Sequence, residues 1–185
     1  SFFEFLPFIK RGLNFGSKKV FYGAECQQVQ GGDNLDDLPI LKCWPEDGGR
    51  FITMGLTITE SPINNKRNMG MYRLQKHDNK TLGMHWHPHK GGAAHYHESS
   101  NLGKSLPVSI VLGGDPALIF SSIAPLPENI DEVLFSAFLK NKKIKLAKSQ
   151  HSNIMIPSNA EFIIEGVVPI NKTRMEGPFG DHFGY

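Results

Sequence analysis

The stretch Phe51-Ile52-Thr53-Met54, continued by Leu56-Thr57-Ile58, decides the fold class, because short apolar alternations of this kind between glycine and proline clusters predict β-strands. Similar stretches follow along the chain. Residues 68–75 and 81–87 flank the turn-prone segment 77–80, so they predict a β-hairpin. Further strands are expected at residues 106–112, 143–147, 154–156 and 161–168. Their regular spacing predicts a mainly β barrel or sandwich.

Two helices are expected between these strands. Asp115 precedes Pro116, which places a capping carboxylate before a proline at the first helical position and predicts a helix over residues 117–123. Asn129 and Glu132 have the spacing of a capping box, and apolar residues follow at helical spacing. The sequence therefore predicts a second helix that Asn129 caps.

Composition and charge narrow the class of protein. A chain of 185 residues fits one domain, and its 39% hydrophobic and 21% charged residues are ordinary for a soluble protein. The net charge of +2 and a lysine run at residues 140–145 without interleaved aromatic residues argue against a nucleic-acid partner. Cys26 and Cys43 lack metal-ligand or redox spacing, which predicts reduced thiols in a cytosolic protein, with a single disulfide as the alternative.

The first residues form a separate unit in this interpretation. Residues 1–16 predict an apolar helical segment, and residues 17–185 a barrel domain. Glu4 and Pro7 interrupt the apolar run, which is too short to span a bilayer and lacks the features of a signal peptide. The segment either docks on its own domain or offers a face to another chain or to a missing domain.

Histidines gather in one short region. His85, His87 and His89 alternate along an expected strand, and His95 and His97 follow closely, so a three-histidine metal site is one hypothesis. The glutamate that cupin-type barrels place shortly after such a motif is absent, as are cysteine-pair and His-Glu-x-x-His zinc motifs. Loop or surface roles are the alternative for each of these histidines.

Acidic residues stand in a glycine- and proline-rich stretch near residue 180. Glu176 and Asp181 follow an apolar strand, where they can be held together for acid/base chemistry or can simply shape a turn.

Five ordered blocks carry a more specific signal. Together they resemble the successive signature blocks of UbiD decarboxylases, over about residues 20–185: residues 38–53, Asn68-Met69-Gly70-Met71-Tyr72-Arg73, Gly113-Gly114-Asp115-Pro116-Ala117, Ala124-Pro125-Leu126-Pro127 with Asp131-Glu132, and Glu176-Gly177-Pro178-Phe179-Gly180-Asp181. The resemblance implies a split β-barrel like that of flavin reductases, which holds prenylated FMN and a divalent metal.

The resemblance also implies which residues hold the cofactor. The family's metal ligands match Asn68, His89 and Glu132, a set of oxygen and imidazole donors that suits Mn2+ or Mg2+, with K+ as a further ion. Each has a structural alternative, as a strand-start residue, a loop residue and a capping residue. The remaining matches to the flavin site are Met71, Arg73, His87, Ser122, Ile123, Ala124 and Pro125. His87 stands where the family usually has glutamine or another residue.

The implied reaction is the loss of CO2 from an aromatic or unsaturated carboxylic acid. The family's catalytic set matches Arg73, Glu176 and Asp181. Arg73 suits a bidentate bond to the substrate carboxylate or to Glu176, and Asp181 suits delivery of a proton to the carbon that has lost CO2. An ordinary salt bridge is the alternative for Arg73.

The wider expectations follow from the same resemblance. A quinone-pathway aromatic acid is the expected substrate, a flavin prenyltransferase supplies the cofactor, and the full-length form is a homo-oligomer in the cytoplasm or peripheral to the membrane. UbiD enzymes run to several hundred residues, so the isolated 185-residue chain is expected to be weakly active. Two rival hypotheses stay open, a flavin-binding or assembly fragment without turnover and a histidine-based metalloenzyme.

Overall fold

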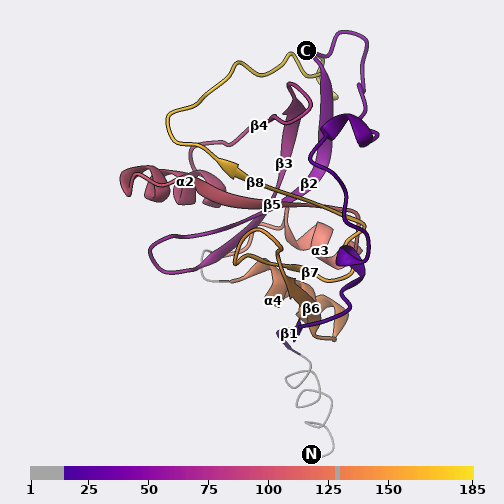
Figure 1. Cartoon of the computed structure of the whole chain (residues 1–185), viewed down its shortest axis with the longest axis vertical. Coiled ribbons are helices and arrows are strands. Elements are labelled where there is room, and N and C mark those ends of the chain that lie inside the picture. Colours follow the sequence, from indigo (N-terminus) through magenta and orange to yellow (C-terminus); the bar gives the residue numbers. More distant parts are fainter. Residues whose placement is uncertain (1–14, 128–129) are drawn as a thin grey trace, which may run out of the picture.

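The computed structural model describes residues 15–127 and 130–185, which fold around two β-sheets (Figure 1). The larger sheet has the strand order β4-β3-β2-β5-β8, with every pair antiparallel. Its strands are β2 (Arg50–Glu60), β3 (Arg67–Lys76), β4 (Leu82–Met84), β5 (Leu106–Leu112) and β8 (Phe162–Val168). The smaller sheet has the order β1-β6-β7, from β1 (Ser17–Val20), β6 (Ile144–Lys148) and β7 (Met155–Pro157).

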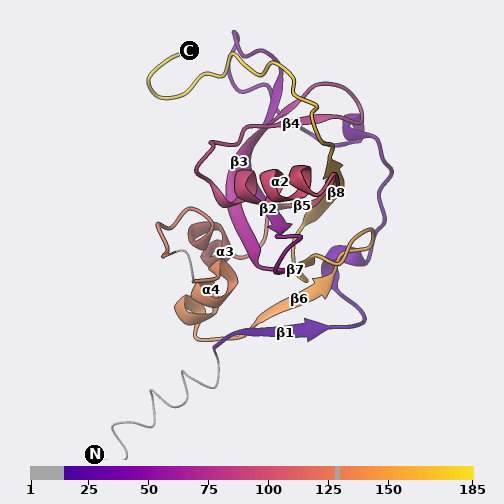
Figure 2. The ribbon, with the colours of Figure 1, turned by 90° about the vertical axis from the view of Figure 1, so that its left-hand side faces the viewer.

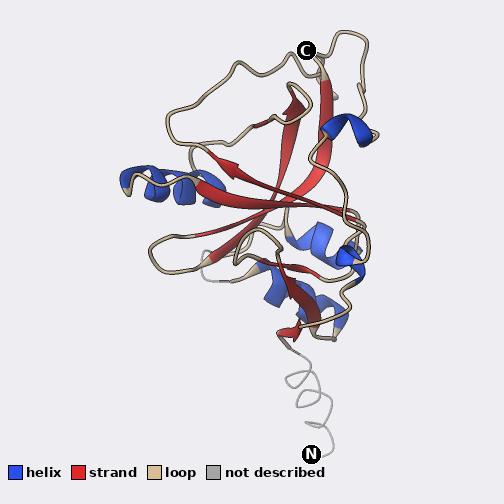
Figure 3. Ribbon diagram, viewed as in Figure 1, coloured by secondary structure: helices blue, strands red, loops and turns tan. Residues whose placement is uncertain are grey.

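Three α-helices and two short 3-10 helices complete the described part of the chain, whose larger part is strand and loop (Figure 3). They are α2 (Gly91–Asn101), α3 (Pro116–Ser121), α4 (Glu132–Lys140), η1 (Glu25–Gln27) and η2 (Leu35–Asp37). Figure 2 shows α2 inside the curve of the larger sheet, with α3 and α4 beside the smaller sheet. The prediction of a mainly β split barrel with a few helices is confirmed.

The two faces of the larger sheet bury separate apolar clusters, because alternate residues of a strand point to opposite faces and a register shift between Ile52 and Gly55 changes the facing of residues along β2. Leu56, Ile58 and Met69 pack on one face with apolar residues of α3, α4, β6 and β7. Ile52 and Leu74 pack with Val108 and Ile110 on the other face, under η2. The alternation at residues 51–58 thus marks a strand that is covered on both sides.

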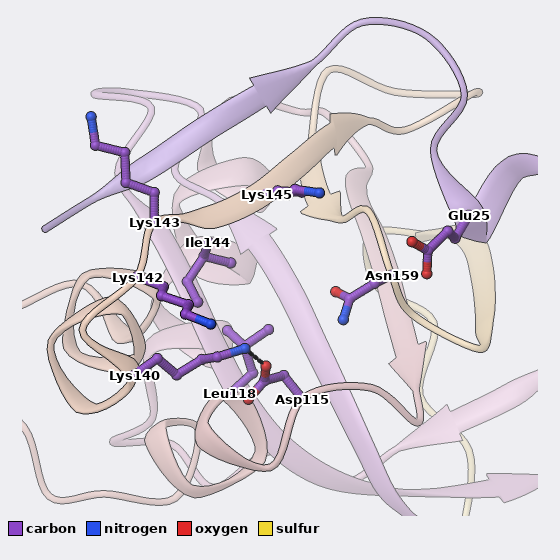
Figure 4. Close-up of a pocket in the computed structure, with 9 residues that line it drawn as sticks. All are labelled: Glu25, Asp115, Leu118, Lys140, Lys142, Lys143, Ile144, Lys145 and Asn159. Atoms are coloured by element: carbon purple, nitrogen blue, oxygen red, sulfur yellow. Dashed lines mark hydrogen bonds and ion pairs between the residues drawn. The ribbon is translucent and has the colours of Figure 1, made fainter. Parts of the chain in front are cut away.

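The expected helix at residues 117–123 is present, with its capping as predicted. α3 begins at Pro116, and the Asp115 carboxylate accepts a bond from the Ala117 N–H. Figure 4 shows that Lys140, from the end of α4, also meets the Asp115 carboxylate beside a small pocket with several lysines. This one side chain therefore links the start of α3 to the end of α4.

The capping prediction for the second helix is wrong. Asn129 lies outside the described residues, and α4 begins at Glu132 with Asp131 as its N-cap, which accepts from the N–H groups of Val133 and Leu134. A single guanidinium nitrogen of Arg67, Nη2, also donates to both oxygens of the Asp131 carboxylate, at 2.8 and 2.6 Å. Because Asp131 caps the helix, the Glu132 side chain is free for another partner.

Three other predictions differ from the structure. Helix α2 was not expected, since Lys90 supplies no side-chain cap and the helix carries no apolar stripe. The second hairpin strand is only Leu82–Met84, because the chain turns into α2 after Trp86. Residues 1–14 of the N-terminal segment lie outside the described residues, while Ser17–Val20 form a parallel partner of β6 that the sequence does not predict.

Cys26 and Cys43 are both free thiols.

The double role of Asp115 gives a test of the fold. We expect Asp115→Ala to lower the free energy of unfolding by about 1 to 2 kcal/mol, because the first turn of α3 loses its cap. Asp115→Asn keeps a capping oxygen and should recover most of that loss, since the exposed end of Lys140 adds little. Urea denaturation of the three proteins measures both values, and equal losses in the two variants would show that capping is not the cause.

Candidate active site

The outer edge of β3 brings several of the predicted site residues together. β4 pairs only with Leu74–Lys76 of this edge, so the earlier N–H groups of the strand are open to other partners. The Met69 N–H donates to a Glu132 carboxylate oxygen at 3.2 Å, and the Met71 N–H donates to the Ser122 carbonyl at 3.4 Å. The end of α3 and the start of α4 therefore dock along the strand edge that also carries Arg73.

Arg73 and Glu176 form a two-point ion pair. Arg73 Nε and Nη2 each lie 2.7 Å from a different oxygen of the Glu176 carboxylate, the geometry that guanidinium and carboxylate groups prefer. The guanidinium carbon also lies 4.7 Å from the centre of the Phe179 ring. The residues are 103 positions apart in the chain, and the predicted pairing of Arg73 with Glu176 is present.

His85 completes this group, a role that the sequence did not indicate. Its Nδ1 lies 3.4 Å from a Glu176 oxygen and 3.5 Å from Arg73 Nη2. The His85 N–H donates to the Arg73 carbonyl and so extends the β3–β4 pairing by one residue. Partial burial alone would raise the pKa of Glu176, but the hydrogen bonds and charges of Arg73 and His85 outweigh it and the pKa is lowered. Glu176 is therefore a carboxylate at neutral pH.

The loop that carries Glu176 is fastened at further points. The Gly177 N–H donates to the Gln75 side chain at 2.9 Å, and the Gly180 N–H donates to the buried Asp47 carboxylate at 2.8 Å. The Gly48 N–H donates to the Pro178 carbonyl at 2.7 Å. Residues 176–180 are thus held on β3 and on the loop before β2.

Asp181 lies beyond these fastenings, in an exposed turn. Its carboxylate accepts a bond from the Phe183 N–H at 2.7 Å, and its backbone pairs with Gly184. This is the arrangement expected of a turn-shaping aspartate.

The three candidate metal ligands occupy neighbouring segments. Glu132 is partly buried, and that burial raises the pKa of its carboxyl group. Asn68 begins the same strand edge, next to the Met69 N–H that Glu132 accepts from. His89 is exposed in the turn before α2, two residues from Gly91, whose backbone lies against the Asn68 amide oxygen. A partly buried carboxylate, an amide oxygen and an imidazole are donor types that divalent cations take, and a cation's charge would offset the cost of burying the carboxylate.

The remaining candidate flavin contacts lie around Arg73 and Met71. Ser122 ends α3, and its hydroxyl donates to the Ile119 carbonyl, so its backbone rather than its side chain faces β3. Ile123 follows with 60% of its surface exposed, and Ala124 and Pro125 continue the same loop. The His87 ring lies 5.0 Å from the His85 ring in an edge-to-face arrangement.

The histidine-based metal site finds no support within residues 15–127 and 130–185. No three His, Cys, Asp or Glu side chains converge there in a way that could hold a metal ion. His95 is instead buried on α2, with its Nδ1 2.9 Å from the Thr59 hydroxyl, and burial lowers its pKa.

The described helices include none with the length and apolar character needed to cross a membrane.

A cavity of about 1720 Å3 opens on the α2 side of the larger sheet and reaches Glu176. Apolar side chains of β5 and β8 line part of it, among them Val108, Ile110 and Ile164. Charged residues, including Lys80 and Arg174, line other parts. Ligand sites commonly combine an apolar lining with a few polar groups in this way.

The amino-acid sequence is similar to those of known proteins. The family model of the UbiD 3-octaprenyl-4-hydroxybenzoate carboxy-lyase Rift-related domain matches residues 18–185. A protein of Chlamydia muridarum is 47% identical over 187 residues, covering 100% of this chain and 32% of that protein. A 4-hydroxybenzoate decarboxylase subunit of Chlamydia pneumoniae is 45% identical over 96% of this chain and 30% of its own length. The chain thus spans about a third of the length of these curated relatives.

Solved structures show the same relationship. The UbiD-class enzyme HmfF from Pelotomaculum thermopropionicum, in complex with FMN, superposes with a TM-score of 0.87 and 25% identity, over 96% of this chain and 41% of that chain. The vanillic acid decarboxylase of Sedimentibacter hydroxybenzoicus in its closed form has a TM-score of 0.81 and 26% identity, over 96% of this chain and 40% of that one.

The Arg73–Glu176 pair predicts a pH-dependent stability. Because the folded-state pKa of Glu176 is lowered, the pair contributes fully above the ordinary glutamate pKa of about 4.3 and its contribution is lost as the pH falls through the lower folded value. We expect Glu176→Gln to cost about 1 to 2 kcal/mol at pH 7 and progressively less as the pH falls below about 4.3. Urea denaturation at several pH values measures the difference. The exposed Glu46→Gln is the control, and a cost for Glu176→Gln that does not vary with pH would contradict the ion-pair explanation.

Proposed function

The chain belongs to the UbiD family, and from this premise we propose that it is the cofactor-binding part of a decarboxylase that uses prenylated FMN and a divalent metal. The observation that carries the proposal is the Arg73–Glu176–His85 group on the open edge of β3. Its substrate would be an aromatic or unsaturated carboxylic acid, for which the named relatives, a 4-hydroxybenzoate and a vanillic acid decarboxylase, are the support.

Arg73, Glu176 and Asp181 would have different roles in the reaction. The bound flavin would supply the electron sink for the carbon that loses CO2. Arg73 would bind the substrate carboxylate through one edge of its guanidinium while Glu176 keeps that guanidinium oriented. Glu176 is a poor proton donor at neutral pH, because its lowered pKa keeps it ionised. Asp181, in its exposed turn, would therefore deliver the proton that replaces CO2.

The residues proposed to bind the metal and the flavin come from the neighbouring segments of the candidate site. Asn68, His89 and Glu132 would hold Mn2+ or Mg2+, whose positive charge would offset the negative charges of Glu132 and of the flavin phosphate. Met71, His87 and the loop of residues 122–125 would lie against the flavin. K+ is a further ion in this proposal. A flavin prenyltransferase would supply the cofactor.

The wider setting is proposed on the same premise. The substrate would belong to quinone biosynthesis, and the full-length protein would be a homo-oligomer in the cytoplasm, a location that the two free thiols suit. Peripheral membrane association is the alternative location. The second candidate function is flavin binding or assembly without turnover, which the exposed turn position of Asp181 favours.

Turnover and flavin content decide between these two functions. We expect the full-length protein, co-expressed with a flavin prenyltransferase, to show a flavin absorption band and to release CO2 from an aromatic acid. Asp181→Asn should keep the flavin band and lose turnover by about 10^2- to 10^4-fold, because the amide cannot cycle a proton. A flavin band without turnover in the wild-type protein would establish the binding function. Near-wild-type turnover in Asp181→Asn would remove this residue from the mechanism.

Metal removal tests the ligand set through stability. In EDTA, we expect Glu132→Gln to be as stable as the wild type or more so, because it no longer buries a charge. With Mn2+ and FMN present, the wild type should gain thermal stability and the variant should not. Glu60→Gln replaces another partly buried glutamate and should respond to Mn2+ like the wild type. An equal Mn2+ response in Glu132→Gln would reject Glu132 as a ligand.

A further inference from the structure

The side chain of Tyr72 extends along β3 toward Asn68. Asn68, Gly70 and Tyr72 are alternate residues of β3 and share the face that α2 covers. A Cβ at Gly70 would lie 2.6 Å from the Tyr72 hydroxyl oxygen and 2.7 Å from two ring carbons, so only glycine leaves room for the ring there. The ring therefore reaches across residue 70, and its hydroxyl oxygen comes within 3.5 Å of Asn68 Nδ2.

The position of Tyr72 is fixed by packing. The residue is 8% exposed, and its ring lies 6.2 Å from the Trp86 ring in an edge-to-face contact. Trp86 packs in turn on the first turn of α2, where a Cβ at Gly92 would lie 2.8 Å from its Nε1. The hydroxyl of Tyr72 is thus presented to Asn68 by a buried ring rather than by a mobile surface side chain.

The oxygen of the Asn68 amide lies close to the backbone of Gly91. A Cβ at Gly91 would lie 2.1 Å from Asn68 Oδ1, so the backbone at the start of α2 passes directly over the amide oxygen. Gly91 follows His89 by two residues. The amide is therefore placed between a phenol on its nitrogen side and the His89–α2 turn on its oxygen side.

This arrangement matters because the two ends of an asparagine amide have similar size but different chemistry. Only the oxygen can bind a cation, whereas the NH2 group needs a hydrogen-bond acceptor. When the oxygen faces the ion, the NH2 group faces the phenol oxygen of Tyr72, which can accept its bond. A ring without that oxygen would leave the NH2 group against an apolar surface, and this orientation would become less favourable.

We propose that Tyr72 is a positioning residue for the metal site, which orients the Asn68 amide so that its oxygen faces the bound cation, and that Gly70 and Gly91 provide the space this requires. The proposal rests on the proposed function, since it takes Asn68 as a metal ligand. It adds a specific outer partner to the ligand set, and such partners commonly change metal affinity when they are removed.

The test measures Mn2+ binding to the FMN-saturated full-length protein, by electron paramagnetic resonance of free Mn2+. We expect Tyr72→Phe to weaken Mn2+ binding by about 10-fold without a large change in melting temperature. Tyr96→Phe is the matched control, because it removes another phenol, which accepts a bond from the Asn171 N–H, and it should bind Mn2+ like the wild type. Equal affinities in the two Tyr→Phe variants would overturn the proposal.

A double variant separates positioning from a general structural effect. If Tyr72 acts through the Asn68 amide, Tyr72→Phe should have no further effect on Mn2+ affinity in the Asn68→Ala background. A further loss there would overturn the proposal. If Asn68→Ala itself leaves Mn2+ affinity unchanged, the ligand assignment of the proposed function fails instead, whatever Tyr72→Phe does.

The glycine requirement gives an independent check. Gly91→Ala should weaken Mn2+ binding, because its methyl group would meet the Asn68 amide oxygen. Gly166→Ala is the control, since a Cβ at that position meets no atom within 4 Å and the residue has no positive φ. Mn2+ affinity in Gly91→Ala equal to that in Gly166→Ala would contradict the close placement of the amide beneath α2.

Discussion

The two-point bond between Arg73 and Glu176 is the interaction on which the candidate site depends. It joins β3 to a loop more than one hundred residues later and orients the only guanidinium in the Arg73–Glu176–His85 group. A partly buried pair of this kind is costly to break on one side, because the remaining charge stays without its partner. The bonds from Gly177 to Gln75 and from Gly180 to Asp47 hold the loop so that the pair keeps its geometry.

The open edge of β3 explains why the site forms at this strand. Unpaired strand edges are usually protected from other chains. In this protein the Met69 and Met71 N–H groups are used internally, by the Glu132 carboxylate and the Ser122 carbonyl. One strand therefore presents a candidate metal ligand, a proposed flavin contact and the proposed catalytic arginine within six residues, from Asn68 to Arg73. Alternation sends Asn68 and Tyr72 to the α2 face and Arg73 to the opposite face.

The sequence predicted the elements whose signals are local. The strand at residues 106–112 is confirmed as Leu106–Leu112, and Asp115 caps α3 as expected from its place before Pro116. The sequence signals were misleading where two neighbouring residues could both cap a helix, and they were absent where a helix had neither a cap nor an apolar stripe. Asp131 rather than Asn129 caps α4, and α2 forms without a capping side chain or an apolar stripe because the curved sheet supports it from β2, β3 and β5.

By itself the sequence determined the fold class, the family and the identity of the candidate site residues, because strand alternation and ordered motif blocks are properties of the chain read in order. Only the tertiary structure decided which of these residues meet. His85 joins Arg73 and Glu176, Asp181 lies in an exposed turn, and Tyr72 reaches Asn68 across Gly70. Such contacts depend on the register of β3 against β4 and on how closely α2 approaches the sheet, and both are set by packing between segments far apart in the chain.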